Sequence, residues 1–180
     1  MPSAASPTIR ALSGRGAWVA AWGILGVALV LTQALVRLVP VALIPIATGM
    51  TSLQWTALAL WVAFCAYSEG YKAFQLRWVP RVVARAFHLG QNPRPLHVVL
   101  APFFCMGLLH ATRRRLIVSW AFVVLITLVV VLVRRLAQPW RGIIDGGVVV
   151  GLGWGLVALL WQATRAGLSG APPEASPELP

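Results

Sequence analysis

Glu69 is the first residue whose type and position could support chemistry, because it is a carboxylate at the end of a long apolar stretch. It follows the string LQWTALALWVAFCAYS and precedes Gly70. A carboxylate within or beside a membrane-spanning segment is a candidate for a proton, ion or substrate site. A structural ion pair is the favoured interpretation, and we expect its partner to be Lys72 or the arginine run at 113–115.

Asp145 is the second carboxylate of this kind, in the string PWRGIIDGG. We expect it in the first turn of a helix, where a negative charge complements the helix dipole and the free N–H groups. Helical geometry places Asp145 roughly opposite Gly147, so it would face lipid unless it pairs with a residue such as Arg141 or Arg135. A structural role is again favoured over a proton or substrate site.

No other pattern in the sequence indicates catalysis, a metal ion or a cofactor. Three histidines could in principle ligate haem iron: His88, His97 and His110. All three lie close together near one predicted membrane surface, which does not suit ligation from two spanning helices. Cys65 and Cys105 lie in apolar stretches without a CxxC spacing, which is typical of small buried side chains. The string GLSG at 167–170 matches a serine-nucleophile motif in letters only, because it lies in a polar tail.

The elements that position these residues are predicted to be membrane-spanning helices. The chain has 180 residues, of which 59% are hydrophobic and 11% charged, whereas soluble domains carry about 25% charged residues. The net charge of +11 would suggest nucleic-acid binding in a soluble protein. Here the basic residues lie between apolar runs, where the positive-inside rule and anionic lipid head groups place them. We expect an all-α fold, a polytopic transmembrane helix bundle, with no nucleic acid as a partner.

Apolar runs and the breaks between them predict four spans in a single bundle covering residues 17–165. The expected spans are 17–39, 52–69, 116–135 and 143–162. Pro40, Pro45 and Gly49 are expected to form the turn after the first span. A polar basic tail is expected at 1–16, and a Pro-, Ser- and Glu-rich tail, predicted to be disordered, at 166–180.

The segment 96–112 leaves the number of spans open between four and five. It is apolar but short, and the arginine run follows it directly. Because no Gly, Pro, Asn or Asp lies between Leu108 and Ala137, the local pattern favours one long helix with the arginines at the interface. Basic residues divide 11 inside to 4 outside for four spans, and 10 to 5 for five, so the positive-inside rule does not separate the two. Four spans are favoured, and both versions place the N-terminus in the cytoplasm.

Residues 71–89 predict an amphipathic helix in the cytoplasmic membrane interface. Basic side chains recur there at spacings of four, four and three, with apolar residues on the opposite face. Pro80 is expected to break this segment into an extension of the second span and a second piece that begins near Pro80. Six basic residues are assigned to a surface that contacts anionic head groups of membrane lipids or a protein partner: Arg77, Arg81, Arg85, Arg113, Arg114 and Arg115.

Gly147, Gly151 and Gly155 are spaced by four residues in the last predicted span. This spacing places them on one helix face over about 12 Å, where a second backbone can approach closely. Packing within the chain is favoured over a face for a homo-oligomer or a membrane-protein partner.

The expected function is binding rather than catalysis. The pattern indicates an accessory, scaffold or assembly subunit of a bacterial inner membrane, with no cofactor, which acts through helix packing and a basic cytoplasmic face. The alternative is a small transporter or channel with a polar site at Glu69 and Asp145. Its weakness is that the predicted spans contain few polar residues.

Overall fold

The computed structural model of the chain describes residues 14–173 and 175–177, and all regular elements in that part are helical. They are α1 (Gly14–Thr48), α2 (Ser52–Cys65), the π-helix η1 (Ala66–Trp78), α3 (Val79–Gln91), α4 (Pro95–Val99), α5 (Ala101–Cys105), α6 (Arg113–Val133) and α7 (Trp140–Ser169). The predicted all-α fold is confirmed. The predicted basic tail at 1–16 falls largely outside the described residues.

Among the residues that the structure describes, three helices are long and apolar enough to cross a membrane: α1, α6 and α7. Each is at least as long as the roughly 20 residues that the hydrocarbon core of a bilayer requires. This finding supports the assignment as a membrane protein.

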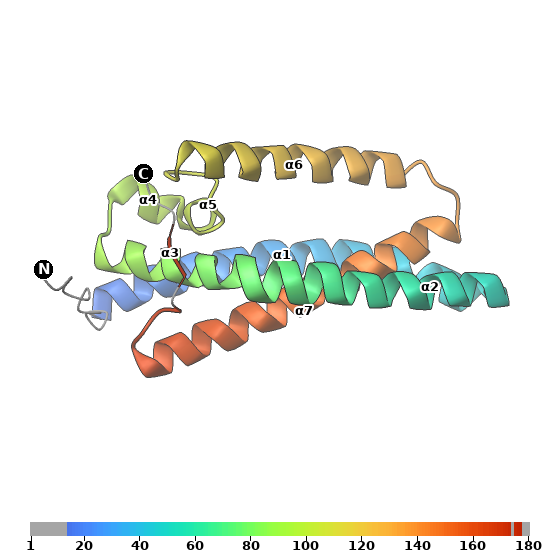
Figure 1. The fold of residues 1–180 in the computed structure, drawn as a ribbon, viewed down its shortest axis with the longest axis horizontal. Helices are drawn as coiled ribbons and strands as arrows, with labels where there is room; N and C mark the ends of the chain where they lie inside the picture. The colour runs from blue at the N-terminus through green and yellow to red at the C-terminus, as the bar shows by residue number, and fades with distance from the viewer. Residues whose placement is uncertain (1–13, 174, 178–180) are drawn as a thin grey trace, which may run out of the picture.

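The long helices lie side by side, except α6, which lies apart from the others (Figure 1). α1 and α7 pack against a straight rod made of α2, η1 and α3, while α6 runs along the outside of this group. The core lies where α1, α3, α5 and α7 meet, and it includes Val27, Val83, Phe104 and Leu159. The side chains of α6 do not contribute to it.

α1 continues through the two prolines that the sequence analysis places in a turn. It ends at Thr48, and the chain reverses at Gly49, whose φ of +88° suits a residue without a side chain. Spanning helices tolerate proline where neighbouring helices pack against the interruption, and Pro45 is buried against Gly142 of α7. Thr51 then starts α2 with a capping box, in which its backbone N–H donates to Gln54 Oε1 at 2.9 Å.

α2, η1 and α3 form one continuous rod, whereas the sequence analysis predicts a break at Pro80. Figure 1 shows these three segments as one continuous helix, coloured from teal at α2 to light green at α3. In η1 the hydrogen bonds span five residues, and the last of them joins Val79 N–H to the Phe74 carbonyl. Pro80 follows this junction directly, and the backbone before it stays helical, with Trp78 and Val79 both in the right-handed helical conformation. The predicted interfacial segment at 71–89 therefore extends the second helix and packs in the bundle through residues such as Val83.

The segment 96–112 forms neither a span nor the start of one long helix. It contains the single-turn helices α4 and α5, followed by a reversal of the chain in which Gly107 has a φ of +78° and His110 a φ of +46°. Thr112 then caps α6 by accepting a hydrogen bond from Arg115 N–H at 3.4 Å. The sequence analysis missed this turn because His110 adopts a left-handed conformation more often taken by glycine or asparagine.

α7 begins earlier and ends later than predicted. It starts at Trp140, where Gln138 Oε1 accepts a hydrogen bond from Gly142 N–H at 3.2 Å. It ends at Ser169, inside the tail expected from residue 166, and Gly170 closes it with a φ of +67°. The described residues that follow lead back to the bundle, where the Pro177 carbonyl meets Arg85.

Candidate functional site

The glycine face of α7 is packed against the rod within the chain. A Cβ atom at Gly147 would lie 2.5 Å from Cδ1 of Trp61 and 2.8 Å from Sγ of Cys65, and one at Gly155 would lie 2.7 Å from the Phe74 ring. Because Gly147, Gly151 and Gly155 are all buried, this face is not open to a second copy or to another protein. Its role in the described structure is intramolecular packing.

Glu69 lies in η1, opposite the middle glycine of that face. A Cβ atom at Gly151 would lie 2.9 Å from Oε2 of Glu69. Neither expected partner reaches it, since Lys72 Nζ instead lies 4.7 Å from the centroid of the Tyr67 ring and Arg115 packs beside Gly107. The described residues form no hydrogen bond or ion pair with this partly buried carboxylate.

Asp145 is 7% exposed and lies beyond the first turn of α7. The helix starts at Trp140 rather than near residue 143, so the expected interaction with the free N–H groups of the first turn is not made. Its Oδ2 atom lies 3.8 Å from Nε of Arg141, within range of an ion pair but not of a hydrogen bond. The positions of α7 beside Asp145 and Glu69 differ by six residues, or about 9 Å along the helix, and the two acids form no common pocket.

Further polar contacts join α7 to the rod, and the sequence analysis did not single them out. Trp154 Nε1 donates to Gln75 Oε1 at 2.7 Å, and Gln162 Nε2 donates to the Gln75 carbonyl at 3.1 Å. Trp61 Nε1 donates to the Ile144 carbonyl at 3.1 Å. Glutamines within or beside apolar segments are the sequence signal that could have identified these polar contacts between α7 and the rod.

Arg85 is buried, which differs from the surface position that the basic stripe predicts. Only 3% of it is exposed. Its guanidinium donates to the carbonyls of Phe104 at 2.6 Å, Leu109 at 2.7 Å and His110 at 3.0 Å, and to that of Pro177 at 2.7 Å. It also lies 4.4 Å from the centroid of the Phe104 ring. The physical reason for burial is that the turn after α5 leaves the carbonyls of Leu109 and His110 without helical partners, and Arg85 supplies their donors.

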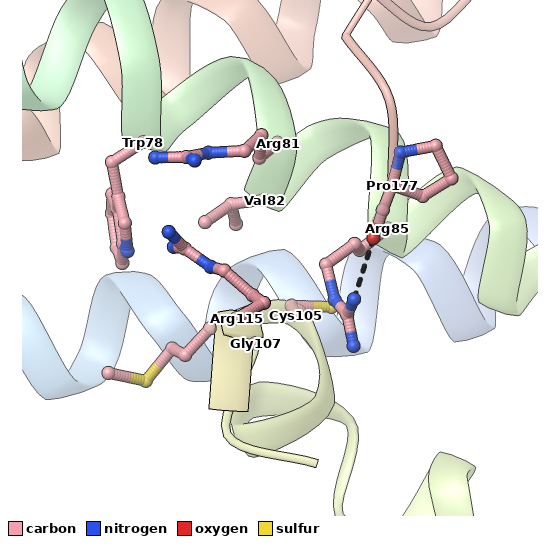
Figure 2. Close-up of a pocket in the computed structure, with 9 residues that line it drawn as sticks. Trp78, Arg81, Val82, Arg85, Cys105, Gly107, Arg115 and Pro177 are labelled. Atoms are coloured by element: carbon pink, nitrogen blue, oxygen red, sulfur yellow. Dashed lines mark hydrogen bonds between the residues drawn. The ribbon is translucent and has the colours of Figure 1, made fainter. Parts of the chain in front are cut away.

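Two further arginines of the predicted surface lie close to Arg85. Figure 2 shows Arg81, Arg85 and Arg115 gathered around a cavity of about 10 Å³, which is also lined by Cys105. This volume is about that of one water molecule. Burial raises the pKa of the Cys105 thiol to about 12, so the thiol is protonated and unreactive at neutral pH. The other three arginines of the predicted surface are exposed: Arg77, Arg113 and Arg114.

The three histidines meet at the end of the bundle where α3 ends. The ring centroids of His97 and His110 lie 4.8 Å apart, and His97 also stacks on Phe104 at 5.0 Å. His88 lines the same pocket from α3, together with Arg94. The pKa of His88 and that of His97 are lowered, first by burial and then by nearby positive charges.

Charged or titratable side chains that can bind an ion or a charged group lie at two positions along the bundle. A carboxylate lies between η1 and α7, and a group of arginines and histidines surrounds the turn from α3 to α6. Among the described residues, no three His, Cys, Asp or Glu side chains converge closely enough to hold a metal ion. Comparisons with protein-family models, with curated proteins and with solved structures find no match to this chain.

Proposed function

We propose that this chain is a four-span membrane protein that acts by binding another membrane protein through α6, rather than by catalysing a reaction. The observation that carries the proposal is the isolation of α6 from the bundle. In its most apolar window 6% of the residues are buried within the chain, against 22% in α1 and 39% in α7.

The exposure of α6 matters because of how helices associate in lipid. Lipid tails solvate apolar side chains as well as protein does, so helices join through close packing rather than through the hydrophobic effect. Ser119 is the one buried residue of α6 in the described structure. α6 is held in place at its ends, by Arg115 beside Gly107 and by the turn that leads into α7. A helix tethered at both ends and unpacked between them is suited to receive a helix of another polypeptide.

The order and direction of the helices support four spans. α2 opens with an apolar stretch and packs beside α7, so we count α2 and the start of η1 as the fourth span in addition to α1, α6 and α7. Successive spans then run in opposite directions, and among the described residues the more basic end of the bundle carries 10 of the 14 Lys and Arg residues. By the positive-inside rule this end, which holds the start of α1 and the end of α7, is cytoplasmic, as expected for a bacterial inner membrane.

A topology measurement tests the four-span arrangement. We expect green fluorescent protein fused to the C-terminus to be fluorescent, because that end is cytoplasmic. We expect alkaline phosphatase fused after Gln138 to be active, because the turn between α6 and α7 lies on the opposite side. A phosphatase-active C-terminus would instead require an odd number of spans.

Site-specific photocrosslinking tests the role of α6. We expect a photoreactive phenylalanine at Leu125 or Leu128 to capture one protein in native membranes, which mass spectrometry would identify. The matched control is Leu29 of α1, which is 70% exposed and compares with 56% and 62% at the two α6 positions. Capture of lipid alone from all three positions would contradict the proposal. An adduct of twice the chain's mass would assign α6 to self-association.

Glu69 favours one alternative function, a transporter or channel. An acid within the bundle that has no partner among the described residues is a candidate proton or cation site. The same purified protein separates the two functions after reconstitution into liposomes. A proton or cation flux that Glu69→Gln abolishes would favour transport, and a lack of flux together with α6 adducts would favour binding.

A further inference from the structure

An open pocket of about 430 Å³ lies between α3, α4 and the turn before α6. Its volume falls in the range of about 300 to 1,000 Å³ that is typical of small-molecule sites. The pocket is lined by His88, Leu89, Asn92, Pro93, Arg94, His97, Phe104 and His110. The lining therefore comes from α3, α4 and α5 and from the loops that follow α3 and α5, and the fold brings the three histidines together.

Positive charge dominates this histidine pocket. Its ionisable lining residues are Arg94 and the three histidines, and no described carboxylate is among them. Arg85 lies behind the wall, with its guanidinium against Phe104 and hydrogen-bonded to the His110 carbonyl at 3.0 Å. An anion in the pocket would thus meet several N–H donors and no opposing negative charge from the described lining.

Exposed apolar side chains lie on α4 and α5, the two short helices that contribute His97 and Phe104 to the pocket. Leu96 and Val99 of α4 are 68% and 73% exposed, and Phe103 of α5 is 50% exposed. In a membrane protein such side chains contact the acyl chains of lipid. A pocket with basic lining residues, formed by short helices that also carry exposed apolar side chains, suits a ligand with a charged group and an apolar tail.

We propose that the histidine pocket binds a phosphate group, and that the molecule carrying it is an anionic phospholipid of the surrounding membrane. Arg94 and the histidine rings donate to the phosphate oxygens, and the acyl chains lie along Leu96, Val99 and Phe103. Soluble inorganic phosphate has the same charged group without the tail, so it serves to distinguish the two sources.

The site is also expected to respond to pH. The charged groups that face His97 are Arg85, Arg94 and His110, and those that face His88 are the same three. Burial, together with the positive charges of Arg85 and Arg94, lowers the pKa of both imidazoles, so both are neutral at pH 7.5. A bound anion favours the protonated rings, so linkage requires binding to tighten as the pH falls and the histidines gain protons.

The test uses the purified full-length chain in a neutral detergent. Calorimetry would measure the Kd for dihexanoyl phosphatidic acid, dihexanoyl phosphatidylglycerol, dihexanoyl phosphatidylcholine and inorganic phosphate. We expect the two anionic lipids to bind, and to bind more tightly at pH 5.5 than at pH 7.5. Phosphate binding as tight as that of the lipids would assign the site to a soluble ligand and overturn the lipid part of the proposal. Equal binding of phosphatidylcholine would overturn the proposal as a whole.

Variants locate the binding. Arg94→Gln and His97→Gln are each expected to weaken anionic-lipid binding by about tenfold, since each removes a charge-assisted hydrogen bond. Arg94 is exposed, so its replacement should leave the fold intact, and the melting temperature would verify this. The matched control is Arg77→Gln, which removes an exposed charge outside the pocket. An equal loss in the control would show that general surface charge is responsible and would contradict a defined site.

Discussion

Replacing Arg85 with leucine is expected to lower the free energy of unfolding by about 3 to 5 kcal/mol, one of the two largest effects that we expect from a single substitution. Arg85 donates to four backbone carbonyls, three of them between Phe104 and His110. A leucine would fill part of the space but leave the Leu109 and His110 carbonyls without donors from Arg85, while the Phe104 carbonyl would keep the Gly107 N–H. Unfolding in mixtures of dodecyl maltoside and sodium dodecyl sulfate, followed by circular dichroism, would measure the change.

Two further variants distinguish the hydrogen bonds of Arg85 from its charge. Arg77→Leu removes an exposed arginine from the same rod and should change stability by no more than about 0.5 kcal/mol. Arg85→Lys keeps the charge but cannot match the planar fork of donors, so an intermediate loss is expected. If Arg85→Lys were as stable as the original chain, the charge rather than the set of hydrogen bonds would account for the effect.

Gly147→Leu is expected to destabilise the bundle by about 3 kcal/mol, at the upper end of the range for overpacked sites. The new side chain would overlap the Trp61 indole and the Cys65 sulfur, which are held between α7 and the rod. The closer of the two contacts involves the rigid indole, so the helices must separate to make room. The same detergent unfolding assay would report the loss.

The chain offers a matched control on the same helix. A Cβ atom at Gly153 would meet no atom within 4 Å, so Gly153→Leu adds the same side chain in open space. We expect its stability to stay within about 0.5 kcal/mol of the original. Equal destabilisation by the two variants would mean that helix propensity or detergent contact, rather than packing against Trp61, governs the response.

The helical membrane character of this chain can be predicted from sequence because it depends on local properties. Long apolar runs such as those of α6 and α7 have few alternatives in a bilayer, where each backbone polar group needs an internal partner. The close packing of Gly147 against another helix likewise follows from the spacing of small residues. Such features need no knowledge of distant contacts.

The paths between the helices could not be predicted in this way, because they depend on tertiary contacts. Proline usually ends a helix, yet α1 continues past Pro45 because a glycine of α7 makes room for the ring. The turn through His110 has little local signal beyond Gly107, since its carbonyls are satisfied by an arginine distant in the sequence. The basic stripe was assigned to the surface for the same reason, because spacing alone does not show that α5 and the turn after it cover Arg85.

The candidate sites likewise include features that follow from the local sequence and features that depend on tertiary contacts. That Asp145 needs a basic partner, such as Arg141, follows from the cost of a charge in lipid and from a spacing of four residues. The meeting of His88, His97 and His110 in one pocket depends instead on how α4 and α5 fold back onto α3. Three histidines in a short stretch of sequence identify the region but not the geometry.

The hydrogen bonds to Gln75 settle a question that the glycine face leaves open. Because the glycines of α7 repeat every four residues, sliding α7 along the rod by four positions would again place Gly151 opposite Trp61 and Gly155 opposite Glu69. Shape therefore distinguishes poorly between the two registers of the helix pair. The bonds from Trp154 and Gln162 to Gln75 exist in only one of them, and a single polar contact of this kind can specify register between packed helices. The hydrogen bonds to Gln75 therefore select one register of α7 against the rod.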